Sequence, residues 1–195
     1  MLSSAQNTSS RNLAATQNFS HDTNVEGSFI LLRHGTNHPE VVIFDAVGSF
    51  STRPTESCAL IIENRQNFLS IEATSSFVDR ECNLDITRGF DVIFGAGNEI
   101  TNALHSTFLS LYDRIYMLFD FDAGGLQIAA TLASITPGSE HVFPIPNNLE
   151  SRLKKVVLHA NQDTLSKVYT LGTNNSFLEI PSKLVVDHKK TIEQE

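Results

Sequence analysis

Apolar and polar residues alternate along the chain in blocks that predict strands and helices in turn. The apolar runs 28–32 and 41–44 flank a polar segment rich in turn residues, and this pattern predicts a β-hairpin with a longer loop. From position 58 onward, short apolar runs alternate with segments of helical spacing. Further strands are expected at 58–62, 91–94, 115–119 and 141–145.

The segments between these runs carry helix signals. Ile100, Leu104, Phe108 and Leu111 recur at spacings of three and four, which predicts a helix over 98–111. Other helices are expected at 65–71, from the Gly124-Gly125 turn to about 134, at 149–159 and at 162–171. Such alternation predicts an α/β fold: a parallel sheet of about four strands flanked by helices, preceded by the hairpin.

Composition divides the chain into three parts. Residues 1–27 are mostly Ser, Thr, Asn and Gln, too polar to offset the entropy of ordering, so we expect a disordered tail. Residues 28–56 form the hairpin extension. Residues 57–195 form the main domain with a helical segment at its C-terminal end, and the 41% hydrophobic content suits one sizeable core.

Charge and cysteine content narrow the function classes. The formal net charge is −8, which argues against a large non-specific nucleic-acid surface. Cys58 and Cys82 make neither a disulfide framework nor a zinc site and are expected to be reduced thiols. No apolar run approaches the roughly 20 residues of a membrane span. We expect a cytoplasmic protein without membrane contact.

Acidic residues follow two of the predicted strands. Asp120 and Asp122 end one strand, where positions i and i+2 share a face, and Glu63 ends another. The carboxyl ends of parallel strands lie on one edge of a sheet, so the three carboxylates converge if their strands are neighbours. Hard oxygen ligands suit Mg²⁺ or Mn²⁺, which would also relieve the repulsion between them. Alternatively, Asp122 and Glu63 only cap the helices that follow.

Three local strings, in order, resemble a known family. They are Glu63-Asn64 with Phe68, the turn Gly95-Ala96-Gly97, and the box from Asp120 and Asp122 to Gly124-Gly125. Together they resemble the Toprim domain of topoisomerases and primases, and most closely that of the JetD nuclease of Wadjet plasmid defence, itself similar to the topoisomerase VI A subunit. The terminal Glu193-Gln194-Glu195 resembles a Glu-Gln-Glu motif near that family's C-terminus.

The resemblance implies a Toprim-like (Rossmann-like) fold and a metal-dependent DNA endonuclease that acts in plasmid or phage defence. Glu63, Asp120 and Asp122 would be catalytic and would bind Mg²⁺ or Mn²⁺, with Glu193 and Glu195 as further ligands. Asn64 and the glycines Gly95, Gly97, Gly124 and Gly125 would support the site. The implied partners are DNA, helped by other subunits, a condensin-like defence complex, and a second copy in a homodimer.

Two other functions fit parts of the same pattern. A non-catalytic Toprim-shaped module would dock onto a larger DNA-processing complex, as the negative charge favours. A haloacid-dehalogenase-type phosphatase also ends a strand in Asp-x-Asp and would use Asp120 as its nucleophile. Tyr112 is expected in a helix and Tyr116 in a strand, where both would be packing residues rather than nucleophiles. Hydrolysis by metal-activated water is therefore expected.

Overall fold

Six strands form one mixed sheet in the computed structural model, which describes residues 27–157 and 159–192. The predicted tail therefore lies almost wholly outside the described residues, as do Glu193 and Glu195. The strand order is β2-β1-β4-β3-β5-β6. The strands are β1 (Ser28–His34), β2 (Glu40–Phe44), β3 (Cys58–Ile62), β4 (Phe90–Phe94), β5 (Arg114–Leu118) and β6 (Glu140–Val142).

The four strands β4, β3, β5 and β6 run parallel, as the sequence predicts. The hairpin of β1 and β2 continues the same sheet, because β1 pairs antiparallel with β4. The helices are α2 (Arg65–Leu69), α3 (Ile71–Cys82), α4 (Ser106–Leu109), α5 (Ala123–Ile135), α6 (Leu149–Lys155), α7 (Gln162–Asn174) and α8 (Glu179–His188), with short 3₁₀ turns η1 (Gly97–Thr101), η2 (Ala103–His105) and η3 (Ser176–Leu178).

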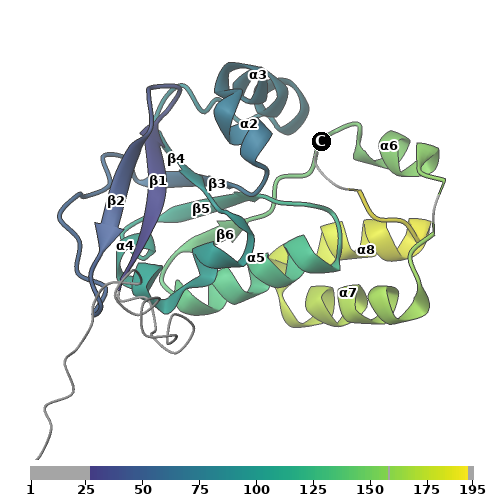
Figure 1. Cartoon of the computed structure of the whole chain (residues 1–195). Coiled ribbons are helices and arrows are strands. Elements are labelled where there is room, and N and C mark those ends of the chain that lie inside the picture. Colours follow the sequence, from purple (N-terminus) through teal and green to yellow (C-terminus); the bar gives the residue numbers. More distant parts are fainter. Residues whose placement is uncertain (1–26, 158, 193–195) are drawn as a thin grey trace, which may run out of the picture.

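Helices cover both faces of the sheet, so the fold is a three-layer α/β arrangement (Figure 1). Alternate residues of β3 separate the two cores: Ile61 packs with α4, α5, α7 and α8, whereas Leu60 and Ile62 pack with α2 and α3. Burial on both faces explains why the parallel strands read as continuous apolar runs. Among the described helices, none is both long and apolar enough to span a membrane.

The prediction of one helix over 98–111 is wrong. The segment instead folds as η1, η2 and the short α4. Asn102 has a non-helical ψ of 129°, and its side-chain oxygen accepts from the Leu104 amide at 3.0 Å. Such local bonding by Asn competes with helical bonding and breaks the run. Ile100 and Phe108 are buried as expected, but Leu111 is 43% exposed.

The sequence did not predict two of the helices, α3 and α8. The predicted helix 65–71 ends at Leu69, and α3 begins at Ile71. The buried face of α3 combines Ile71 and Val78 with Thr74 and Ser75. Because two of these four residues are polar, the apolar spacing typical of a helix is not visible in the sequence. Helix α8 carries Pro181 in its first turn, where a missing amide hydrogen costs little.

A buried acidic residue anchors the opposite edge of the sheet, at the start of β4. Asp91 is fully buried. Its carboxylate contacts His34 Nδ1 at 2.7 Å and accepts from the Tyr112 hydroxyl and the Thr55 amide at 3.0 and 3.1 Å. These bonds tie the hairpin, the loop before β3 and the segment before β5 to β4. Tyr112 is thus a packing residue, although it follows α4 rather than lying in a helix.

Candidate acidic site at the carboxyl edge of the sheet

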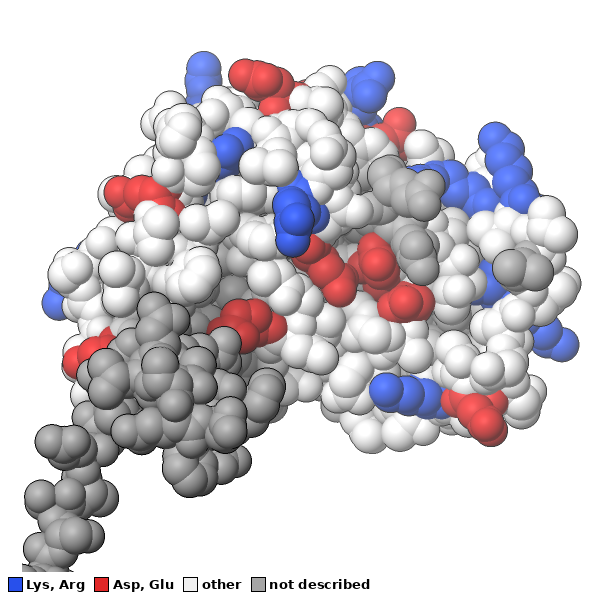
Figure 2. Space-filling model, viewed as in Figure 1, with Lys and Arg blue, Asp and Glu red and all other residues white. Residues whose placement is uncertain are grey.

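Glu63 and Asp120 meet because their strands are neighbours in register. Strands β3 and β5 pair in parallel, with Ile62 opposite Leu118, so both chains leave the sheet on the same edge. The Glu63 amide donates to the Leu118 carbonyl at 3.2 Å, and Glu63 Oε2 accepts from the Asp120 amide at 3.2 Å. Acidic side chains gather in the middle of the face shown in Figure 2.

Asp122 caps the helix that follows this loop. It is the N-cap of α5, and its Oδ1 accepts from the Gly125 amide at 2.8 Å. The structure therefore confirms that Asp122 caps a helix, whereas the cap of α2 is Asn64 and not Glu63. The negative charge of Asp122 still acts on Glu63, as described next.

The three carboxylates influence one another electrostatically. Burial raises the pKa of the Glu63 carboxyl above its usual range, the bond from the Asp120 amide opposes this rise, and the negative charges of Asp120 and Asp122 add to it. All three side chains are half-buried. A cation placed among them would offset this repulsion, and carboxylate oxygens are the ligands that Mg²⁺ and Mn²⁺ prefer. The donor chemistry therefore fits a hard divalent ion.

The arrangement of these side chains is not that of a preformed metal centre. Across residues 27–157 and 159–192, no three His, Cys, Asp or Glu side chains are grouped so that they could hold a metal ion. Glu63 is turned to the Asp120 amide, and one oxygen of Asp122 is committed to the helix cap.

Asn64 and Phe68 build the turn that carries Glu63. Asn64 caps α2, and its Oδ1 accepts from the amides of Gln66 and Asn67 at 2.7 and 3.2 Å. Phe68 is buried beneath this turn, with its ring centroid 5.5 Å from that of Phe94. The Glu-Asn-x-x-x-Phe string is thus a cap and an anchor that fix where Glu63 leaves β3.

Two glycines allow the loops of the site to approach one another closely. Gly95 donates to the Ile62 carbonyl at 2.8 Å, and a Cβ at Gly95 would lie 3.3 Å from that oxygen. A Cβ at Gly125 would overlap the Asp120 carbonyl oxygen and lie 2.8 Å from the Asp120 nitrogen. Gly97 has a φ of +64°, which favours glycine.

The predicted turn at Gly124 and Gly125 is wrong in detail, because both residues lie in the first turn of α5. Gly124 is exposed, whereas Gly125 is buried against the Asp120 backbone. The need for glycine at the second position is therefore steric rather than conformational.

The C-terminal segment reaches the same loop. Phe121 and Ile192 form an antiparallel bridge, with amide-to-carbonyl distances of 2.9 and 3.2 Å. Glu193 follows Ile192 directly in the sequence, but Glu193 and Glu195 are outside the described residues.

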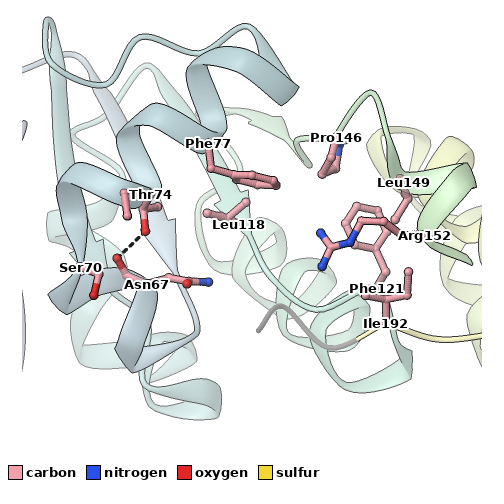
Figure 3. A pocket seen from close by; sticks show the side chains of 11 residues that line it. Asn67, Ser70, Thr74, Phe77, Leu118, Phe121, Pro146, Leu149, Arg152 and Ile192 are labelled. Carbon is pink, nitrogen blue, oxygen red and sulfur yellow. Dashed lines mark hydrogen bonds between the residues drawn. The ribbon is translucent and has the colours of Figure 1, made fainter. Parts of the chain in front are cut away.

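Sequence reasoning missed a pocket that adjoins the acidic site. Its volume is about 200 Å³. Its walls come from α2, α3, the end of β5, the segment before α6, α6 itself and the C-terminal segment (Figure 3). It is lined by Asn67, Ser70, Ala73, Thr74, Phe77, Leu118, Phe121, Pro146, Leu149, Arg152 and Ile192. These residues are scattered along the chain, so no local pattern marks the pocket.

No family model matches this chain, and no curated protein matches its sequence.

Proposed function

We propose that this protein is a metal-dependent DNA endonuclease of the Toprim type, similar to the JetD nuclease of plasmid defence. The observation that carries the proposal is the bond between Glu63 Oε2 and the Asp120 amide. It joins the ends of β3 and β5, the two positions that the resemblance assigns to catalysis. The fold class and the order of the three strings support the same proposal.

Glu63, Asp120 and Asp122 would hold Mg²⁺ or Mn²⁺. When bound, such an ion lowers the pKa of its water and neutralises charge on a phosphodiester. The raised pKa of Glu63 suits a group that exchanges protons with water or with the leaving oxygen. Glu193 is a further proposed ligand, supported by the bridge that holds Ile192 at Phe121.

DNA binding would depend on partner subunits in this proposal. The net charge of −8 and the acidic side chains of the face in Figure 2 oppose tight binding to a polyanion. A condensin-like complex and a second copy of the chain are the proposed partners.

A non-catalytic interaction module is the second candidate function. It is favoured by the commitment of one Asp122 oxygen to the helix cap and by the lack of a preformed three-residue metal group in the described part of the chain. A phosphatase with Asp120 as nucleophile is less well supported, because that chemistry gives no role to the contact between Glu63 and Asp120.

Plasmid nicking separates these functions. Supercoiled plasmid with Mn²⁺ at low salt should be nicked by the wild type, and Glu63→Gln and Asp120→Asn should each slow nicking by about 100-fold or more. Asp113→Asn is the matched control, since Asp113 is exposed and precedes the other end of β5. If no nicking occurs in any condition, the module is favoured. Hydrolysis of p-nitrophenyl phosphate that survives Glu63→Gln would indicate the phosphatase.

A further inference from the structure

The pocket beside the acidic site combines apolar walls with one cation. Figure 3 shows Phe77 from α3 and Arg152 from α6 reaching into it from opposite sides, with Leu118 next to Phe77. The lining includes no Asp or Glu, although the whole chain is strongly acidic. A single guanidinium in such surroundings favours a ligand that has both an apolar ring and a negative charge.

Arg152 is available for such a ligand. Within the described residues, its side chain takes part in no ion pair, whereas its neighbour Lys154 pairs with Glu150 at 2.8 Å. A guanidinium offers a planar fork of donors that matches the oxygens of a phosphate. Because no described acidic residue pairs with Arg152 at the pocket, its guanidinium favours an anionic group on the ligand.

The size of the pocket limits the ring. About 200 Å³ is below the roughly 300–1,000 Å³ of sites for drug-sized molecules, so one planar ring system fits and a larger ligand must extend outside. The side chain of Asn67 points to the pocket and carries amide donors and acceptors. The partly exposed ring of Phe77 provides aromatic surface, on which a nucleobase stacks well.

The position of the pocket relates it to the acidic loop. Phe121 lines the pocket and lies between Asp120 and Asp122, and Leu118 ends β5 just before them. Asn67 lies on α2, the helix that Asn64 caps next to Glu63. A ligand in the pocket would therefore hold its neighbouring groups close to the three carboxylates.

We infer that this pocket binds one unstacked base of single-stranded DNA, with an adjoining phosphate on Arg152. The inference rests on the proposed nuclease function and gives its substrate class: a strand with at least one unpaired nucleotide next to the cleaved bond. The base packs against Phe77, and the backbone passes over the acidic loop. Intact duplex, whose bases are stacked, fits this pocket poorly.

Binding without metal tests the inference independently of cleavage. Fluorescence anisotropy with a labelled ten-nucleotide dT strand, in EDTA and at low salt, should show binding by the wild type. An abasic strand with the same phosphates should bind about fivefold or more weakly, since base–aromatic stacking is worth at least that factor. Equal affinity for the two strands would overturn the base pocket. Displacement of the strand by equimolar dTMP would show that a free nucleotide is the ligand instead.

Two variants of α6 test the role of Arg152. Arg152→Ala should weaken dT binding about tenfold or more through loss of a charge-assisted contact. Lys155→Ala removes the same charge from an exposed position of the same helix and should change binding less than about twofold. If the two variants lose the same affinity, Arg152 contributes only its positive charge and no specific contact with the phosphate, and the inference is overturned. If the wild type binds the dT strand in EDTA but does not nick plasmid with Mn²⁺, only the nuclease proposal is contradicted.

Discussion

The two adjacent glycines of α5 give a sharp test of how the acidic loop is built. Gly124 and Gly125 both lie in the first turn of the helix, but only Gly125 is packed against another part of the backbone. At Gly124 a new Cβ would meet Asp122 Oδ1 at 3.2 Å, and this is a side-chain atom that can shift slightly. At Gly125 it would overlap the Asp120 carbonyl oxygen, a backbone atom that cannot move without shifting the loop.

The magnitudes follow from two opposing effects. Replacing Gly by Ala in a helix gains about 1 kcal/mol. Overpacking against fixed atoms costs about 1–3 kcal/mol or more, and the overlap with backbone atoms at Gly125 places this case in the upper part, about 2–3 kcal/mol. A weakened bond from the Gly125 amide to Asp122 would cost about 1 kcal/mol further. We therefore expect Gly125→Ala to lower the free energy of unfolding by about 2–3 kcal/mol after the helix gain, whereas Gly124→Ala changes it by less than about 1 kcal/mol.

Differential scanning calorimetry in EDTA measures the difference. A loss of 2–3 kcal/mol corresponds to a fall in Tm of about 5–10 °C for a chain of this length, while Gly124→Ala should stay within about 3 °C of the wild type. If both variants have the same Tm, the close approach between α5 and the Asp120 backbone is refuted.

Two further predictions concern the buried polar groups. Asp91→Ala should destabilise the protein by about 3 kcal/mol or more, because it leaves the buried Tyr112 hydroxyl without its acceptor and removes the contact to His34; Asp113→Ala, at an exposed aspartate, should cost little in the same urea titration, and similar costs would contradict the network. Burial lowers the pKa of His105 below its ordinary 6.5, so the unfolded chain takes up the proton first as the pH falls. Stability should therefore decline below about pH 6.5 until the folded pKa is reached, and His105→Gln should decline less; identical Tm profiles from pH 7.5 to 5 would contradict this assignment.

The sheet was largely predictable because its strands are apolar on both faces. The runs at β3, β4 and β5 stand out in the sequence, and their alternation with helices sets a parallel order. Convergence of Glu63 and Asp120 was predicted on the condition that their strands are neighbours, and β3 and β5 meet that condition. The hairpin was also predicted, but its pairing with β4 was not. No local sequence pattern shows which strands pair when they lie far apart in the chain.

The failures have physical causes in particular residues. Asn102 breaks an apolar period that looked helical, and Thr74 and Ser75 hide one that is helical. The position of Asp91 could have indicated its role, because an acidic residue in an otherwise apolar strand must have polar partners when it is buried. No such signal marks Arg152, since its relation to Phe77 and Phe121 arises only from the fold.

Calorimetric titration with Mn²⁺ tests the central claim most directly: Glu63, Asp120 and Asp122 together hold a divalent ion. The wild type should bind Mn²⁺ at millimolar concentration or below and gain Tm as the metal is added. Asp120→Asn and Glu63→Gln should abolish both effects, whereas Asp113→Asn, with the same loss of charge away from the loop, should keep them. Absence of Mn²⁺ binding in the wild type, or equal binding by Asp120→Asn, would contradict the metal site and with it the proposed nuclease.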